Sequence, residues 1–278
     1  MITPLALDIV SEARKAQTGI GAFNVVLLEH AEAIASGAAG ARRPVIFQIS
    51  QNCITYHGGL APIALATLSI ARSMDVPGLV HLDHADDVGL VHEAVDLGID
   101  SVMFDASSLP YSDNVSLTRE VASYCHDRGV LVEAELGEIG GKDGVHAPGA
   151  RTQPAEARAF VESTGVDWLA VAVGTSHAMT TRDAAVDYNL IARLSSDVTS
   201  PLVLHGSSGL PDEHLRLAVQ AGMTKVNIST HLNALFTGAV RQSLTDSTTS
   251  VDPRKYVSPG RAAIADEVTR LLGLLHIQ

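Results

Sequence analysis

Eight short runs rich in apolar and β-branched residues recur along the 278-residue chain, and each is followed by a loop and a stretch of helical periodicity. The runs are Ile20–Asn24, Pro44–Ser50, Gly78–Asp83, Ile99–Asp105, Val130–Glu135, Val166–Val173, Pro201–His205 and Thr224–Ile228. Each run is almost continuously apolar, which is typical of parallel strands covered on both faces. Eight strand–helix units in a chain of this length predict an α/β fold of the TIM (β/α)8 barrel type.

The stretches between these runs have the periodicity of amphipathic helices. Examples are Leu60–Met74, Val88–Leu97, Asp113–Arg128, Pro154–Thr164 and Asp212–Ala221. An open, doubly wound sheet is the alternative architecture for alternating strands and helices. The Gly-x-Gly-x-x-Gly turn that would favour this sheet does not follow the first predicted strand, so the barrel is the preferred prediction.

Two stretches are longer than a minimal barrel requires. The Gly-rich connection Leu136–Arg151 follows the fifth strand, and a loop of this length is usually functional, often as a lid. The tail contains Pro253 and Pro259 and then predicts a helix from about Arg261 to Leu275. We expect a single domain over residues 1–278, whose extension over about 245–278 packs outside the barrel or at a subunit interface.

Charge and composition narrow the classes of function. The chain has 19 Lys and Arg against 31 Asp and Glu, a net charge of −12, which argues against nucleic-acid or anionic-membrane partners. No apolar run approaches the roughly 18 residues that span a bilayer, and the first residues lack the basic segment of a signal peptide. Cys53 and Cys125 are too few for a disulfide framework or a cysteine-based zinc site. We therefore expect a soluble, cytoplasmic protein.

Polar or metal-binding side chains stand at the end of every predicted strand, where a TIM barrel places its chemistry. They are Asn24, Ser50, Asp83 with His84, Asp105, Glu135, His177, His205 and Asn227. Three of them, His84, His177 and His205, are histidines from three different strand ends. A single one of the 12 histidines is more often a surface residue, but three neutral imidazoles with an open fourth position make a catalytic zinc site.

Carboxylates accompany these histidines. Asp83 directly precedes His84, and it is either a general acid/base beside the metal or a group that orients a metal-binding histidine. Asp105 and Glu135 either serve an alternative metal position, orient the metal ligands, or act as hydrogen-bond partners at the barrel end. His81 shares the inward face of Asp83, so it is a candidate for supporting a ligand rather than for binding the metal.

The loops after the seventh and eighth strands form a second group of candidates. They read His205-Gly206-Ser207-Ser208-Gly209 and Asn227-Ile228-Ser229-Thr230. TIM barrels commonly bind phosphate at these two loops, where small residues let backbone N–H groups approach the oxygens and a helix N-terminus adds its dipole. The alternative interpretation of Ser229 and Thr230 is a simple helix N-cap.

Several motifs in order resemble one family across almost the whole chain. They are Ala22-Phe23-Asn24, Leu82-Asp83-His84, Glu133-Ala134-Glu135-Leu136-Gly137, Gly140-Gly141, Val173-Gly174-Thr175-Ser176-His177, Leu204-His205-Gly206-Ser207-Ser208-Gly209, Lys225-Val226-Asn227-Ile228 and Asp252-Pro253-Arg254-Lys255-Tyr256. This set resembles the class II, zinc-dependent ketose-bisphosphate aldolases, which include fructose- and tagatose-bisphosphate aldolases.

The resemblance implies a role for each matching residue. His84, His177 and His205 would bind the catalytic Zn²⁺, and Glu135 and Asp105 would serve a second or resting metal position. Asp83 would act as acid/base at the C4 oxygen. Zinc would polarise the C2 carbonyl and stabilise the enediolate that develops as the C3–C4 bond breaks.

The resemblance also implies how the substrate is held. Asn24 and Asn227 would hydrogen-bond the substrate, with Asn227 near the enediolate. The phosphate of the ketone half would be held by Ser50, Gly174, Ala178, Gly206, Ser207, Ser208, Ser229 and Thr230, with a monovalent cation (Na⁺ or K⁺) as a candidate neighbour. Arg261 resembles the basic residue that meets the distal phosphate from a neighbouring subunit, which implies a homodimer or homotetramer.

Two residues depart from the family pattern. Asp143 stands in the Gly-rich loop where the family usually has the Glu that takes the C3 proton, and this side chain is one methylene shorter. Misplacing a base by about 1 Å costs on the order of 10²-fold in rate. Ala178 replaces the usual Gly after His177, which strains the loop or narrows the phosphate site if that backbone needs a positive φ. Both departures bear on substrate choice and efficiency.

The leading prediction is a metal-dependent aldolase that releases dihydroxyacetone phosphate, with fructose 1,6-bisphosphate as the default substrate. Tagatose bisphosphate and a phosphorylated deoxyketo-sugar acid are alternatives. A Schiff-base aldolase would need an inward lysine, and Lys225 is the one lysine on a predicted strand. A barrel hydrolase is disfavoured because the first strand ends in Phe23-Asn24 rather than His-x-His. A non-catalytic sugar-phosphate binder remains a further alternative, motivated by Asp143 and Ala178.

Overall fold

The eight predicted strands form a closed parallel barrel in which each strand pairs with the next along the chain and β1 pairs with β8. The computed structural model describes residues 4–136, 151–175 and 186–276. The strands are β1 Ile20–Asn24, β2 Val45–Ser50, β3 Gly78–Ala85, β4 Ser101–Phe104, β5 Leu131–Glu135, β6 Trp168–Ala170, β7 Leu202–Leu204 and β8 Met223–Ile228. This closed topology confirms the TIM barrel and excludes the open sheet.

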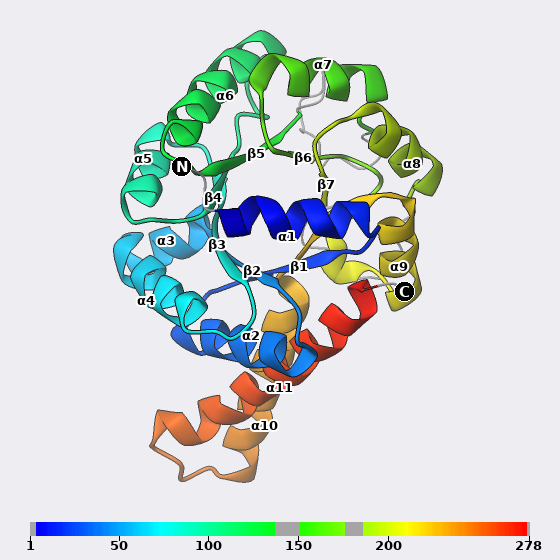
Figure 1. Cartoon of the computed structure of the whole chain (residues 1–278). Coiled ribbons are helices and arrows are strands. Elements are labelled where there is room, and N and C mark those ends of the chain that lie inside the picture. The colour runs from blue at the N-terminus through cyan, green and yellow to red at the C-terminus, as the bar shows by residue number, and fades with distance from the viewer. Residues whose placement is uncertain (1–3, 137–150, 176–185, 277–278) are drawn as a thin grey trace.

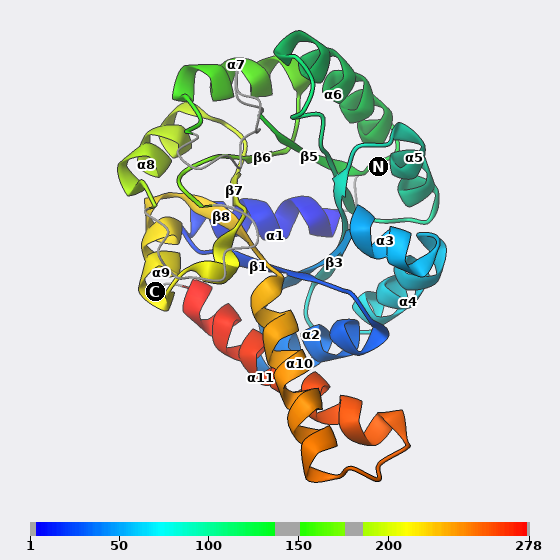
Figure 2. The same cartoon turned by 180° about the vertical axis from the view of Figure 1, so that it is seen from behind.

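Helices surround the barrel (Figures 1 and 2). In the described residues they are α1 Pro4–Lys15, α2 Leu28–Ala41, α3 Gln51–His57, α4 Ala61–Arg72, α5 Val88–Asp96, α6 Tyr111–His126, α7 Pro154–Thr164, α8 Tyr188–Asp197, α9 Asp212–Ala221, α10 Thr230–Asp246 and α11 Pro253–Leu275. A short 3-10 turn, η1 Ser207–Gly209, follows β7. Taken singly, none of the described helices is long and apolar enough to cross a membrane, although α3 and α4, bent by 116° at their junction, pass that test as a pair.

The helix α1, an addition to the predicted elements, lies across one opening of the barrel (Figure 1). Its Val10 and Ala13 join a buried apolar cluster with the first residues of several strands, among them Ile20 and Leu79. Arg14 donates hydrogen bonds to the carbonyl oxygens of Val198 and Thr199, which ties the end of α1 to the end of α8. The N-terminal end of the barrel is therefore closed by packing, and the C-terminal ends of the strands form the opposite face.

The strand β3 ends in an irregularity that shapes this opposite face. Its pairing with β4 shifts register between Leu82 and Ala85. Within that segment His84 has a φ of 51°, in the left-handed region that side chains other than Gly rarely adopt. The bulge turns the His84 side chain independently of the alternation that the rest of β3 follows, and the predicted strand Gly78–Asp83 is extended by two residues.

The predicted strands Val166–Val173 and Pro201–His205 are longer than the observed β6 and β7. Residues 171–173 are buried without belonging to the strand, so the apolar run continues past the barrel ladder. The C-terminal helix was also predicted too short, because α11 begins at Pro253, where the Asp252 side chain accepts a hydrogen bond from Arg254 N. Pro is well accommodated at the first helical position, and Pro259 lies inside the helix.

The last two helices lie side by side and project from the barrel as an arm (Figures 1 and 2). The helix α11 then packs along α2 on the outside of the barrel. The contact is close at Gly37, where an added Cβ would lie 2.6 Å from Val268 Cβ. At its end, α11 meets the start of β1, where Gly19 N donates to Leu275 O at 2.9 Å.

Candidate active site

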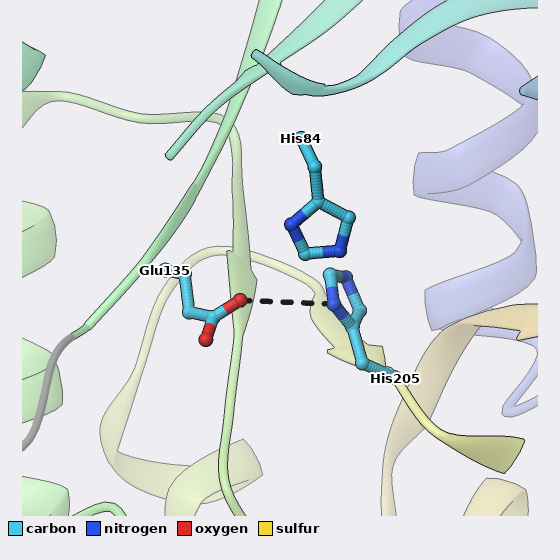
Figure 3. Close-up of side chains that lie close together, drawn as sticks. All are labelled: His84, Glu135 and His205. Carbon is cyan, nitrogen blue, oxygen red and sulfur yellow. Dashed lines mark ion pairs between the residues drawn. The ribbon is translucent and has the colours of Figure 1, made fainter. Parts of the chain in front are cut away.

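Three of the predicted metal-binding residues meet at the C-terminal face of the barrel. His84 comes from β3, Glu135 ends β5 and His205 follows β7, and one ligand atom from each lies within 4.8 Å of the others. Figure 3 shows the two imidazoles next to each other in an edge-to-face arrangement, with the Glu135 carboxylate directed at His205. Their ring centroids are 4.8 Å apart, and His205 Nδ1 lies 3.7 Å from Glu135 Oε2. Two imidazoles and a carboxylate are a donor set that suits Zn²⁺.

Asp105 accepts a hydrogen bond from the His84 ring. Its Oδ2 lies 2.9 Å from His84 Nδ1, and its Oδ1 accepts from the backbone N and the Oγ of Ser107. Burial alone would raise the pKa of Asp105, but the hydrogen bonds from His84 and Ser107 hold this pKa well below its usual range. Asp105 is thus placed to orient a metal ligand, one of the roles left open by the sequence, and it lies outside the three-residue cluster.

The cluster around His84 carries an excess of negative charge. Burial lowers the pKa of His84, but the charges of Asp83 and Glu135 and the hydrogen bond that His84 donates to Asp105 outweigh it and raise this pKa to about 9. These groups stabilise a cation at this position, either a proton on the imidazole or a metal ion in its place. The electrostatics therefore agree with the donor set in favouring a metal site.

Asp83 lies beside this cluster at the end of a hydrogen-bonded chain. Gln48 Nε2 donates to Asn24 Oδ1 at 3.2 Å, and Asn24 Nδ2 donates to Asp83 Oδ2 at 3.1 Å. Asp83 is 4% exposed, and its second oxygen, Oδ1, has no hydrogen-bond partner among the described residues. One carboxylate oxygen is thus fixed while the other remains available for proton exchange with a ligand. Sequence reasoning missed Gln48, although a polar residue inside the apolar strand β2 was a signal.

The loops after β6, β7 and β8 are joined to one another. Thr175 Oγ1 donates to His205 O at 2.7 Å, Ser207 Oγ donates to Asn227 O, and Ser229 N donates to Ser208 Oγ at 3.1 Å.

The backbone conformation of these loops and their position at the start of a helix suit them to bind an anion. Gly174 and Gly206 have φ values of 109° and 67°, which glycine adopts without strain. The 17-residue helix α10 starts at Thr230, directly after Ser229, so its N-terminal dipole points at this loop cluster. The side chain of Asn227 is buried nearby, and its Oδ1 has no hydrogen-bond partner in the described part of the chain.

Ser50 lies at the same face of the barrel, because it ends β2 and pairs in register with Asp83. It is also the N-cap of α3, where its Oγ accepts from Cys53 N at 3.3 Å. Arg261 lies on α11 outside the barrel, where its Nη1 is 2.6 Å from Glu32 Oε2 on α2. Asp143, His177 and Ala178 lie outside the described residues.

A buried charged network lies inside the barrel below the cluster. Lys225 Nζ on β8 is 2.6 Å from Glu133 Oε2 on β5, and Glu133 Oε1 is 2.9 Å from His205 Nε2. His81 lies in the same layer, and burial and the charge of Lys225 hold its pKa well below the usual range. Because Lys225 is engaged in this ion pair, the structure does not favour the Schiff-base alternative. Sequence reasoning missed Glu133, although its spacing of two from Glu135 puts both on the inward face of β5.

Comparisons with known proteins agree on one family. The model of the class-II fructose-bisphosphate aldolases matches residues 6–278. A fructose-bisphosphate aldolase from Giardia intestinalis is 38% identical over 285 residues, covering 93% of this chain and 88% of that protein.

Solved structures agree with this result. The crystal structure of the YdjI aldolase from Escherichia coli K12 superposes with a TM-score of 0.85 at 28% identity, covering 99% of this chain and 97% of that one. A fructose-bisphosphate aldolase from Campylobacter jejuni superposes with a TM-score of 0.81 at 21% identity, covering 97% and 93% of the two chains, which shows the shared fold.

Proposed function

Because this chain belongs to the class II fructose-bisphosphate aldolase family, whose members are lyases, we propose that it reversibly cleaves a phosphorylated ketose into dihydroxyacetone phosphate and an aldehyde. The observation that carries this proposal is the convergence of His84, Glu135 and His205 beside Asp83 at the mouth of the barrel. The loops after β7 and β8 would supply an anion site next to that cluster. A metal-dependent carbon–carbon lyase acting on a sugar phosphate uses these three parts together.

His84 and His205 would hold a zinc ion, with Glu135 as the third donor within reach. His177, the third histidine implied by the sequence, would complete the set. When bound, zinc supplies a Lewis acid that polarises the substrate carbonyl. Asp105 keeps Nδ1 of His84 engaged, so Nε2 is the nitrogen left to face the metal.

Asp83 would carry the proton at the C4 oxygen. In cleavage it accepts the C4 hydroxyl proton as the C3–C4 bond breaks and the aldehyde forms, and in condensation it returns that proton. Its Oδ1 is the atom for this exchange, because Oδ2 is held by Asn24. Proton transfer at C3 is assigned to Asp143, which stands where the family has Glu.

The phosphate of the ketone half would lie at the loops joined by Ser207 and Ser208 and at the start of α10. Asn24 and Asn227 would hydrogen-bond the substrate between this phosphate and the metal. We propose further that the protein works as a homodimer or homotetramer in which the partner subunit's Arg261 meets the distal phosphate. Fructose 1,6-bisphosphate is the first substrate to test, because the Giardia intestinalis relative is a fructose-bisphosphate aldolase.

The first experiment is hydrogen–deuterium exchange at C3 of dihydroxyacetone phosphate, with zinc-loaded and with EDTA-treated protein. This half-reaction requires no choice of aldehyde. Stereospecific exchange that depends on the metal supports the proposal. Absence of exchange in protein shown to contain zinc would refute aldolase chemistry with this donor, and ligand binding without exchange would favour a non-catalytic sugar-phosphate binder.

The second experiment identifies the substrate. Initial rates of cleavage are compared for fructose 1,6-bisphosphate, tagatose 1,6-bisphosphate and a phosphorylated deoxyketo-sugar acid at equal concentration. We expect fructose 1,6-bisphosphate to have the highest kcat/KM. A higher kcat/KM for either alternative would reassign the substrate while leaving the aldolase reaction in place.

A further inference from the structure

We propose that Glu133 and Lys225 are positioning residues for the metal site, because their buried ion pair fixes the His205 imidazole with Nδ1 as its metal-binding atom. The proposal deepens the proposed function and rests on His205 being a metal ligand. It also gives Lys225 a role other than Schiff-base formation.

Glu133 uses both of its carboxylate oxygens inside the barrel. Oε2 is 2.6 Å from Lys225 Nζ, and Oε1 is 2.9 Å from His205 Nε2. The Glu133 and Lys225 side chains are 0% and 1% exposed. A carboxylate removed from water in this way is costly unless a cation and further hydrogen bonds compensate it. Lys225 supplies the cation on one oxygen, which leaves the other oxygen to accept the proton on His205 Nε2.

The hydrogen bond to Glu133 selects the tautomer of His205. A neutral imidazole carries one proton, so with Nε2–H donating to Glu133, the lone pair lies on Nδ1. His205 Nδ1 is also the atom that faces Glu135, at 3.7 Å from Oε2. A carboxylate that accepts from the second ring nitrogen orients a metal-bound histidine and increases its basicity. Glu133 therefore does for His205 what Asp105 does for His84.

The surroundings of Lys225 hold the ion pair in one arrangement. Lys225 Nζ lies 3.4 Å from His81 Nε2 and 5.8 Å from the centroid of the Trp168 ring. Lysine can only donate, so His81 accepts on Nε2 and donates its Nδ1–H to Ser101 Oγ at 2.8 Å. The network thus connects side chains of β3, β4, β5 and β8 before it reaches His205. Because four strands hold it, it fixes the orientation of the His205 ring.

The test compares Glu133→Gln, Lys225→Met and the double variant with the wild type. The zinc dissociation constant is measured by competition with a chromophoric chelator, and the visible absorption spectrum of the Co²⁺-loaded protein is recorded. We expect Glu133→Gln to weaken zinc binding by about 10- to 100-fold and to change the Co²⁺ spectrum, because the neutral amide is a poorer acceptor for His205.

The double variant separates positioning from folding. It leaves neither charge unpaired, so its melting temperature should exceed that of Lys225→Met. Its zinc affinity should nevertheless stay as low as that of Glu133→Gln, because the carboxylate on His205 is still missing. If Lys225→Met fails to fold, the double variant decides the question. The emission of Trp168, the single tryptophan of the chain, reports whether the layer around Lys225 keeps its packing.

Asp100→Asn is the matched control. Asp100 is a buried carboxylate whose Oδ1 lies 2.6 Å from Arg72 Nη2 and whose Oδ2 accepts from Val80 N, and it does not contact His205. We expect this variant to melt at a lower temperature than the wild type while keeping its zinc affinity and Co²⁺ spectrum. A control that lost zinc affinity as much as Glu133→Gln would attribute the effect to general destabilisation and overturn the proposal.

The outcomes distinguish this inference from the proposed function. Wild-type protein that binds neither zinc nor cobalt would overturn the proposed metal site itself. Wild-type protein that binds both metals, with Glu133→Gln and the double variant binding zinc equally well and giving the same Co²⁺ spectrum, would overturn only the positioning role.

Discussion

His84 lies among Asp83, Asp105 and Glu135, and in the metal-free protein this raises its pKa from 6.5 to about 9. Between these two values the folded state binds a proton that the unfolded state has released. The stabilisation is thus complete below pH 6.5 and is lost as the pH rises through about 9. We expect the free energy of unfolding of EDTA-treated protein to fall by up to about 3 kcal/mol across this interval. Thermal melts at several pH values measure this.

Zinc-loaded protein and Asp105→Asn are the controls for this pH dependence. A metal-bound imidazole has already released its proton, so the zinc-loaded protein should lose little stability between pH 6.5 and 9. Asp105→Asn removes one of the charges that favour the imidazolium and should reduce the slope in the metal-free protein. A metal-free wild type whose melting temperature is constant over this range would contradict the assignment.

Asp83 and His205 should respond differently to truncation. We expect Asp83→Ala to retain zinc and to lose turnover by about 10²- to 10⁴-fold, because it removes an acid/base and no metal ligand. His205→Ala should lose the metal itself. Metal analysis of the purified variants together with kcat measures the difference. Retention of zinc by both variants would refute the ligand assignment.

The site was predictable from sequence wherever a polar residue ended an apolar strand. This rule found His84, Asp83, Glu135 and His205, which the structure brings to one face. It did not find Glu133, because that residue lies inside β5 rather than at its end, and only its spacing of two from Glu135 indicates that it faces inward. The orienting role of Asp105 depends on a hydrogen bond across two strands, so only the structure could select it among the alternatives.

At the scale of elements, the contact between α2 and α11 depends on the absence of a side chain at Gly37. An added Cβ would lie 2.6 Å from Val268 Cβ and 2.7 Å from Ala265 O, and neither atom can move without shifting the helix. We expect Gly37→Ala to lower the free energy of unfolding by about 1–3 kcal/mol, as overpacking does in a well-packed contact. Chemical denaturation measures the change.

Gly238→Ala in α10 is the matched control for this substitution. Gly238 is also helical, but among the described residues no atom beyond its chain neighbours and its own helix backbone lies within 4 Å of its added Cβ. Here alanine should stabilise the protein by up to about 1 kcal/mol through helix propensity. Equal effects of the two substitutions would show that the α2–α11 contact is looser than the structure indicates.

The order of elements was predictable because each strand is buried on both faces and each helix on one. The residues at which the elements end were not predictable, because burial and strand pairing do not stop at the same residue. Val173 is fully buried although β6 ends at Ala170, so hydrophobicity extended the predicted strand. The sequence predicts that the last helix begins after Pro259, but a helix already capped by Asp252 contains this proline. The helix α1 closes the barrel through contacts with many strands, which no local pattern reveals.

For the whole molecule, removal of the metal should affect both activity and stability. We expect EDTA to abolish turnover and zinc or cobalt to restore it. A ligand that binds only the folded state also stabilises it, by about 2.7 kcal/mol at a free concentration of one hundred times its dissociation constant. The melting temperature should therefore rise with zinc concentration. Full activity after complete metal removal, verified by elemental analysis, would contradict the metal-dependent mechanism.

Because His84 has a positive φ, selection for stability and selection for catalysis favour different residues at this position. Glycine would adopt this conformation without steric cost but would remove an imidazole from the metal cluster. In a saturation library of metal-free protein sorted for resistance to unfolding above about pH 9, where the proton on His84 no longer contributes, glycine should become enriched at position 84, whereas sorting for catalysis should retain histidine. A lineage that lost the need for this reaction would therefore be free to replace His84 early, and the residue found there can serve as a record of whether catalysis is still under selection.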